Sequence, residues 1–447
     1  MSMLSVFISA ILLFLSILIN KKGPLHPTVL FFIIWMAVCS ASAFQITMYQ
    51  ASSESYKLII IMLVCFFVGS LSYLMPSFSS ARAPENEKIS DNFNLYLGPI
   101  YFLLIVYILF STIDSLIIVK NYLGGTQLWE MRSWRMSTYG VDSNPLIDRQ
   151  SFLEVVLRAV VLYPFQNLVA PLAAFMFFNK KMRNKHKMFF VLAVICLLIT
   201  VVATGGSRNT IVYYFGCFIL CFILYAGKTG HEVKKKQSKF GRFLGLIVIV
   251  GAGSWLVLAV TNARTNISFG TTISSYLGVS PTLLSLQLPQ IQQSAHTFGL
   301  MSVFGLITYP VRFLQQIGLG AIVPSAYDLA YQQVLNAQQF LVVNSSGLNR
   351  NAYVTPIYYF MIDGGIFFVI IGSLIFGFIL GRFSKRFFSN MTLKNFIYYA
   401  VIMQAIVFSF VQVPTVQPSF VFSLILTWIL VRPRQVDRRV DKDVMIK

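Results

Sequence analysis

Long apolar runs, each about as long as a helix that crosses a membrane, recur along this sequence. A helical span needs roughly 20 mostly apolar residues. Eleven such stretches occur, at residues 3–20, 27–47, 58–75, 95–119, 152–178, 187–204, 209–226, 242–262, 354–381, 394–411 and 416–431. Only 11% of the 447 residues are charged, whereas soluble domains carry about 25%. We therefore predict an all-α fold, a polytopic bundle of about eleven spans, with twelve as the alternative count. Residues 1–447 would form a single integral membrane domain.

The distribution of basic residues predicts the orientation of these spans. The net charge is +20, and most Lys and Arg residues fall in alternate connections and in the C-terminal tail. Such clusters include residues 180–187, 228–242 and 432–447. This pattern is typical of cytoplasmic segments of membrane proteins. It predicts a cytoplasmic C-terminus, and it explains the positive charge without a nucleic-acid partner.

Ten of the 35 basic residues fall outside this pattern, on the predicted outer side or within a span, and eight of the ten are arginines. Retention of positive charge in the cytoplasm does not account for them. A planar, permanently charged guanidinium is suited to bidentate binding of phosphate or carboxylate. The alternative for each one is an ion pair with a nearby acid, or a position at the membrane interface. The eight are Arg132, Arg135, Arg149, Arg158, Arg208, Arg264, Arg312 and Arg350.

The first long outer connection covers residues 120–151 and mixes aromatic with charged side chains. It contains Arg132, Arg135, Asp142 and Asp148 among Trp, Tyr and turn residues. Aromatic rings beside polar groups are suited to sugars, which have apolar C–H faces and a rim of hydroxyls. They are equally typical of the aromatic belt at a membrane surface, so the composition leaves both interpretations open.

The second long outer connection covers residues 263–353. Its part from Phe298 to Val323 is apolar but is interrupted by glycines, Pro310 and Arg312, which predicts a re-entrant or interfacial hairpin instead of a full span. Irregular backbone at membrane depth is tolerated only where protein or a wet cavity lines it. Connections of this length are more often functional than filler. We expect it to hold short or re-entrant helices.

Two short segments carry further candidate site residues. Gly205 and Gly206 precede Arg208, where a helix is predicted to begin, and exposed N–H groups beside a guanidinium can bind an anion. An ordinary interfacial arginine is the alternative. In the second segment, Asp363 lies about two turns inside an apolar helix and precedes Gly364 and Gly365. A carboxylate there is costly and is a functional candidate by default, with an ion pair to an arginine of another helix as the alternative.

Both segments resemble a known family. The Gly-Ser-Arg turn at 206–208 resembles the motif of the O-antigen polymerase and ligase superfamily. The stretch Asn349–Gly381, NRNAYVTPIYYFMIDGGIFFVIIGSLIFGFILG, is similar to oligosaccharide repeat-unit polymerases of the Wzy type. The number of predicted helices and the long outer loop also match that family in layout.

The resemblance implies a multi-pass enzyme of the bacterial inner membrane with its active site facing the periplasm. Such enzymes transfer a glycan from undecaprenyl diphosphate to another lipid-linked repeat unit. A chain-length regulator and a flippase would be partners, alongside membrane lipid, and no cofactor is implied. Periplasmic arginines would hold the diphosphate, which by position points to Arg208, Arg264 and Arg350, with Arg312 as a further candidate. Arg132, Arg135, Asn351 and Tyr353 complete the expected substrate-binding set.

Glycan transfer also needs a stabilised leaving group and usually a base. Two or three arginines can stabilise a departing diphosphate without a metal ion, so no metal site is expected. The candidate bases are Asp142, Asp148, Asp363 and His296, of which His296 could equally be an ordinary solvated histidine. Two alternatives remain open: a ligase that transfers O-antigen to the lipid A core, and a flippase or polysaccharide transporter.

Overall fold

The computed structural model describes residues 1–20, 26–44, 48–74, 97–125, 152–178, 184–203, 208–228, 251, 269–345, 347–350, 354–389 and 392–431. This part of the chain is mostly helical, and five of its helical segments are long and apolar enough to cross a membrane. The predicted helical membrane architecture is confirmed at that level. The finer count of about eleven spans stays a prediction.

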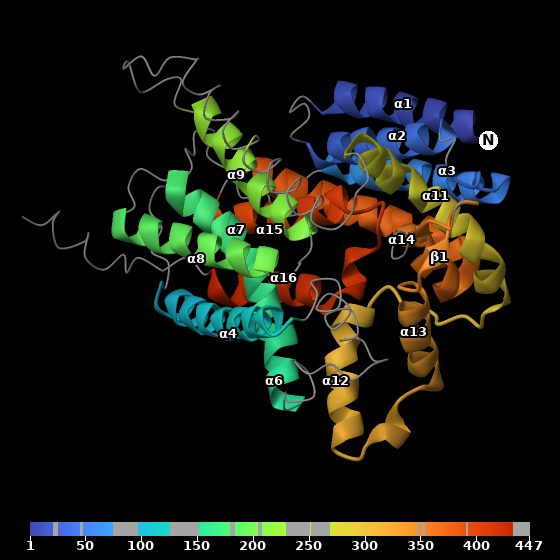
Figure 1. Ribbon diagram of the computed structural model, residues 1–447. Helices are drawn as coiled ribbons and strands as arrows, with labels where there is room; N and C mark the ends of the chain where they lie inside the picture. Colours follow the sequence, from blue (N-terminus) through green and yellow to red (C-terminus); the bar gives the residue numbers. More distant parts are fainter. Residues whose placement is uncertain are drawn as a thin grey trace, which may run out of the picture.

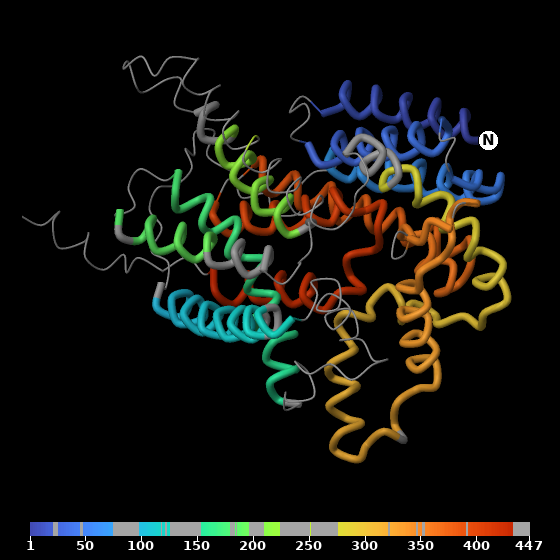
Figure 2. The backbone as a smooth tube through the Cα atoms, in the orientation of Figure 1, coloured from blue at the N-terminus to red at the C-terminus, as the bar shows by residue number. Residues whose placement is uncertain are grey.

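Figure 1 shows the helices in chain order, and Figure 2 follows the backbone through them. Ten of the eleven predicted stretches coincide with a helix; all but one residue of the eleventh, 242–262, lies outside the described residues. The helices are α1 (Ser2–Ile19), α2 (Pro27–Ala43), α3 (Ser53–Ser70), η2 (Leu71–Tyr73), α4 (Leu97–Leu123), α6 (Phe152–Leu157), η4 (Arg158–Leu162), α7 (Tyr163–Phe178), α8 (Asn184–Ala203), α9 (Arg208–Lys228), α11 (Phe269–Gln293), α12 (Phe304–Gln316), η5 (Gly320–Ile322), α13 (Ser325–Asn336), α14 (Thr355–Ser389), α15 (Leu393–Val407), η6 (Pro414–Val416) and α16 (Pro418–Leu430).

The helices differ in length. The five segments that are long and apolar enough to span are α1, α3 with η2, α4, the run α6–η4–α7, and α14. Helices α8 and α9, with 20 and 21 residues, are of similar length. Helices α2, α15 and α16 have 17, 15 and 13 residues. At about 1.5 Å per residue, the last two do not cover a hydrocarbon core about 30 Å thick unless flanking residues extend them.

The region 263–353 contains a longer helix than its sequence predicts. It contains α11, a helix of 25 residues with Pro281 and Pro289 inside it, and then α12, η5 and α13. Tertiary packing stabilises α11, because it buries Leu283, Leu284 and Leu288 and packs against α2, α3 and α14. The region also contains a small exception to the all-α prediction. Strands β1 (Leu341–Val342) and β2 (Asn349–Arg350) pair antiparallel, with Leu341 opposite Arg350.

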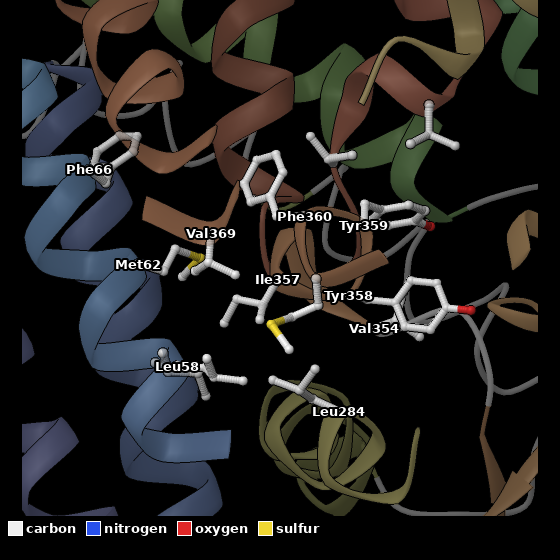
Figure 3. Close-up of a cluster of buried hydrophobic side chains, with 14 of the residues drawn as sticks. Leu58, Met62, Phe66, Leu284, Val354, Ile357, Tyr358, Tyr359, Phe360 and Val369 are labelled. Atoms are coloured by element: carbon white, nitrogen blue, oxygen red, sulfur yellow. The ribbon is translucent and has the colours of Figure 1, made fainter. Parts of the chain in front are cut away.

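Two large hydrophobic clusters form most of the core. One joins side chains of α2, α3, α11, α13 and α14, and the other joins α4, α7, α8, α9, α15 and α16. Figure 3 shows part of the first cluster, where Leu58 and Met62 of α3 face Ile357 of α14 and Leu284 of α11. The first cluster therefore ties the region 263–353 to α2, α3 and α14.

Helices α3 and α14 approach each other closely because small residues line their contact. A methyl group on Gly377 would overlap the carbonyl oxygen of Phe66, and one on Gly69 would overlap that of Leu374. The Ser72 hydroxyl donates a hydrogen bond to the Phe378 carbonyl oxygen at 3.0 Å. Small residues and hydroxyl bonds of this kind hold helices together inside membranes, where the hydrophobic effect between them is weak.

We predict that Gly377→Ala lowers the stability of the protein, because the added methyl must push α3 away from α14. Overpacking of this kind costs about 1–3 kcal/mol. The matched control is Gly216→Ala in α9, where an added methyl meets nothing within 4 Å. Alanine is otherwise the better helix former, so the control should be neutral or stabilising. Thermal unfolding in detergent measures both; equal midpoints would contradict the tight contact.

Candidate functional site

Helix α14 is broken between two and three turns after its start, directly after Asp363. Gly364 has φ 172° and ψ 39°, and Gly365 has φ 66° and ψ −153°, so neither continues the helix. The conformation of Gly365 is one that only glycine adopts readily. A methyl group on Gly364 would in addition overlap the ring of Phe368. The pair therefore ends one helical half at Asp363 and starts the second half after it.

The segment Thr297–Ser302, here called the clamp segment, surrounds the carboxylate of Asp363. Oδ1 accepts hydrogen bonds from the Thr297 hydroxyl at 2.6 Å and from the backbone N–H groups of Gly299 at 3.0 Å and Met301 at 2.9 Å. Oδ2 accepts from the Ser302 N–H at 2.9 Å and its hydroxyl at 2.6 Å. Asp363 is fully buried, so these five donors take the place of water around its charge.

The same segment also satisfies the end of the first half of α14. The N–H groups of Thr297 and Phe298 donate to the carbonyl oxygens of Ile362 and Asp363, at 3.1 and 2.9 Å. Backbone groups left open by a helix break must find partners within the protein at membrane depth. Phe298 takes a left-handed conformation with φ 50°, which is unfavourable for a bulky residue. The hydrogen bonds of the clamp segment therefore stabilise two backbone features that are unfavourable on their own, the open end of the first part of α14 and the left-handed conformation of Phe298.

This arrangement changes the interpretation of Asp363. Its partners are backbone N–H groups and hydroxyls of the clamp segment, instead of the arginine expected as the alternative to a catalytic role. A carboxylate surrounded by five donors supports structure, and abstraction of a substrate proton would require it to release one of them. The sequence holds no local signal of this contact, because the partners lie 61 to 66 positions away along the chain.

His296, another candidate base, lies next to the clamp. It directly precedes Thr297, and its side chain is exposed. Its Cε1 atom is 3.9 Å from the position that a methyl group on Gly365 would occupy. Its ring lies edge-on to Phe298, with centroids 6.4 Å apart. The structure thus brings His296 to the break in α14, beside Asp363, although the two residues are distant in the sequence.

Arg312 lies on α12 and contacts tyrosines of α13. Its Nη2 atom donates to the Tyr331 hydroxyl at 3.0 Å, and its guanidinium carbon is 5.3 Å from the centroid of the Tyr331 ring. Burial raises the pKa of the Tyr327 hydroxyl, and the neighbouring Arg312 opposes that shift. Within the described residues, no acid forms an ion pair with Arg312. A cation held against aromatic rings keeps its charge available to an anion.

Arg350 lies in strand β2 and is placed in a similar way. Its guanidinium carbon is 5.2 Å from the centroid of the Tyr276 ring in α11. Its Nη1 atom donates to the Asn349 carbonyl oxygen at 3.1 Å. The chain runs from β2 towards Thr355, where α14 begins. Arg312, Arg350 and His296 all belong to the region 263–353, of which α11 packs against α14.

The structure gives less information on the other predicted site residues. Arg208 begins α9, as its sequence suggests, but only the backbone at this position is described. Helix α9 packs on α7, which packs on α16, which in turn packs on α12. Two helices thus link the helix of Arg208 to that of Arg312. The remaining predicted residues lie outside the described part of the chain: Arg132, Arg135, Asp142, Asp148, Arg264, Asn351 and Tyr353.

For Arg158, the structure confirms the ion-pair alternative. This buried residue lies in η4, a π-helical turn, between α6 and α7. It donates to both carboxylate oxygens of Asp114 on α4, at 2.6 and 3.1 Å, and from Nε to Glu154 at 2.9 Å. It also stacks over Phe110 at 5.0 Å. The pairing joins the two helices that flank residues 120–151, and the i, i+4 spacing of Glu154 and Arg158 was its only local signal.

No metal centre is evident in the part of the chain that the structure describes, where no group of three or more His, Cys, Asp or Glu side chains is close enough to hold an ion. Comparison with protein-family models, with curated proteins and with solved structures finds no match to this chain. Its function must therefore be inferred from its own residues.

We predict that Asp363→Ala destabilises the protein by several kcal/mol, because each buried donor left without a partner costs about 1–3 kcal/mol. Asp363→Asn should be intermediate, since its amide nitrogen cannot accept from Ser302. Thermal unfolding in detergent measures the loss, and hydrogen exchange should rise in residues 294–303. The control is Asp328→Asn, at an exposed position on α13. Equal stability of all variants would show that the carboxylate does not hold the clamp.

We also predict that Arg158→Met is destabilising by about 3 kcal/mol, because removing one partner of a buried pair leaves the other charges uncompensated. The triple variant that also carries Asp114→Asn and Glu154→Gln should recover part of the loss. Lys57→Met, at an exposed position, serves as the control for losing a positive charge. If the single and triple variants unfold at the same temperature, the three charges are not coupled.

Proposed function

We propose that the protein is a membrane glycosyltransferase that joins lipid-diphosphate-linked oligosaccharide units into a polysaccharide. The resemblance of residues 206–208 and 349–381 to repeat-unit polymerases supports this proposal, as do the apolar helices and the long ordered region 263–353. The donor would be an undecaprenyl-diphosphate-linked glycan and the acceptor a second lipid-linked unit. The reaction would take place on the periplasmic face of a bacterial inner membrane.

The placement of Arg312 and Arg350 carries the proposal. Each guanidinium lies over a tyrosine ring, at 5.3 and 5.2 Å, and both residues belong to the region 263–353. Stacking fixes the plane of a guanidinium, while its N–H donors point along the edge of that plane. An edge of this kind can bind a diphosphate in a bidentate manner. Arg208 and Arg264 would extend the same diphosphate-binding set.

In the proposed reaction, an acceptor hydroxyl attacks the anomeric carbon of the donor sugar. The bond from that carbon to the diphosphate oxygen breaks, and the arginines stabilise the charge that develops on the leaving group. The hydroxyl proton passes to a base, for which His296 is the described candidate and Asp142 and Asp148 are the candidates in the first outer loop. We assign Asp363 a positioning role, because it holds the segment that carries His296.

A flippase or polysaccharide transporter is the second candidate, and the break in α14 favours it. Discontinuous helices often form the substrate sites of secondary transporters, and Gly364 and Gly365 interrupt a long apolar helix. A ligase that transfers O-antigen to the lipid A core is a further alternative, since it would use the same donor with a different acceptor.

We predict that Arg208→Ala, Arg264→Ala, Arg312→Ala or Arg350→Ala leaves the protein inserted but lowers polymerisation by about 100-fold, the usual cost of one transition-state contact. Lysine should rescue poorly where binding is bidentate. Lys57→Ala is the control, because it removes an exposed cation from the same predicted side. Gel ladders of surface polysaccharide from a complemented deletion strain report chain length. Normal ladders from all four alanine variants would exclude the arginine site.

The deletion strain itself distinguishes the three candidates. Loss of a polymerase leaves lipid A core capped with a single repeat unit. Loss of a ligase leaves bare core, while lipid-linked polymer still forms. Loss of a flippase leaves bare core and accumulates single lipid-linked units on the cytoplasmic side. Only the first pattern agrees with the proposal.

A further inference from the structure

Helix α12 exposes a stripe made only of apolar residues. Val303, which directly precedes the helix, is followed at helical spacing by Leu306, Pro310, Phe313 and Ile317, and all five are exposed. The side chains of the four other than Pro310 are between 43% and 53% exposed. Spacings of three and four residues place the five side chains on one face of the helix. A face of this kind on a folded protein normally marks contact with an apolar partner.

Near the start of α12, the opposite face is already occupied. Phe304, Gly305 and Thr308 are buried there, and the helix packs against α16 and η6. A methyl group on Gly305 would overlap the backbone of Thr415 and Gln417, so the contact is close. The stripe therefore faces away from the bundle, and the described part of the chain does not cover it.

The depth of α12 follows from the clamp at Asp363. Ser302, one residue before Val303, is hydrogen-bonded to that carboxylate, which lies about two turns inside the apolar helix α14. Just beyond the break, α14 exposes Ile366 and Phe367, as a helix facing lipid does. The stripe thus begins one residue after a bond to Asp363, which is close in the chain to the point where α14 first exposes large apolar side chains.

The direction and length of α12 decide how it meets the membrane. With 13 residues it is about 20 Å long, too short to cross a hydrocarbon core of about 30 Å. Figure 1 shows it running across the direction of α14 instead of alongside it. From Phe313 to Tyr327 the chain carries no charged residue, and Ile322 at the far turn is exposed.

We propose that α12 is an interfacial helix whose stripe is embedded among the acyl chains of one lipid leaflet. An amphipathic helix lying in the membrane surface buries its apolar face at the boundary between headgroups and acyl chains. Arg312 lies off the stripe, against Tyr331, and so sits at headgroup depth. This assignment concerns lipid contact alone and holds whether or not the protein transfers glycans.

The test measures the surroundings of the stripe in the full-length protein, reconstituted in nanodiscs of phosphatidylcholine and phosphatidylglycerol. Native cysteines are replaced, and a nitroxide label is attached at Leu306→Cys, Phe313→Cys or Ile317→Cys. Gln315→Cys, exposed on the opposite side of the same helix, and Gln332→Cys on α13 are the controls. Collisions with oxygen report acyl chains, and collisions with a nickel chelate report water.

We expect collisions with oxygen to dominate at the three stripe positions and collisions with the nickel chelate to dominate at Gln332. At Gln315, the share of collisions with the chelate should be higher than at the stripe positions. Dominance of the chelate along the stripe would show that it faces water and would overturn the proposal. Protection from both reagents would also overturn it, because another protein surface would then cover the stripe.

A second measurement serves where the labelled variants do not fold. Phe313→Trp and Ile317→Trp retain the native cysteines and an apolar side chain. Lipids brominated on the acyl chains should quench the added fluorescence more strongly than a water-soluble quencher does, after subtraction of the five native tryptophans. Stronger quenching from the water phase would contradict the embedded position.

Discussion

The hydrogen bonding of the Asp363 carboxylate is the interaction on which the arrangement of the region 263–353 against α14 depends. A helix broken inside an apolar bundle leaves backbone groups that water cannot reach. Here the clamp segment supplies hydrogen-bond donors to two sets of acceptors. Its N–H groups and hydroxyls bind the carboxylate, and two further N–H groups bind the carbonyl oxygens at the helix end. The position of His296 and the starting point of α12 both follow from that contact.

The arginines that the charge pattern singles out have different environments, so their residue type alone did not reveal a role. Arg158 is fixed between two acids and joins neighbouring helices, which accounts for it structurally. Arg312 and Arg350 lie on tyrosine rings. A guanidinium neutralised by carboxylates has little attraction left for a phosphate, whereas one stacked on an aromatic face retains it. For Arg312, which forms no ion pair with an acid within the described residues, that contrast is the physical basis for weighting it above Arg158.

The sequence predicted the elements whose stability is local and missed those that depend on distant partners. Uniform apolar runs predicted ten helices, because a membrane environment allows little else for such segments. Helix α11 escaped prediction, since Pro281, Pro289 and many polar residues weaken its pattern and packing against α2, α3 and α14 stabilises it. For Asp363 the position was predicted but the partners were not. They lie in a segment of ordinary polar and apolar residues, and only the fold brings that segment to the break.

The clamp also bears on whether the break in α14 is a hinge. Alternating access in a secondary transporter is largely a rigid-body movement of one group of helices against another, and a hinge at a broken helix would in addition change the angle between its two parts. Opening this break would release hydrogen bonds to a buried carboxylate, at a cost on the order of 5 kcal/mol or more. Both parts of α14 in addition pack on α3, the first through Ile357 beside Leu58 and Met62 and the second through the close packing of Gly377. A break fixed on both sides resembles a static platform more than a moving part. A static platform suits an enzyme that must hold a leaving group and a base at a constant separation.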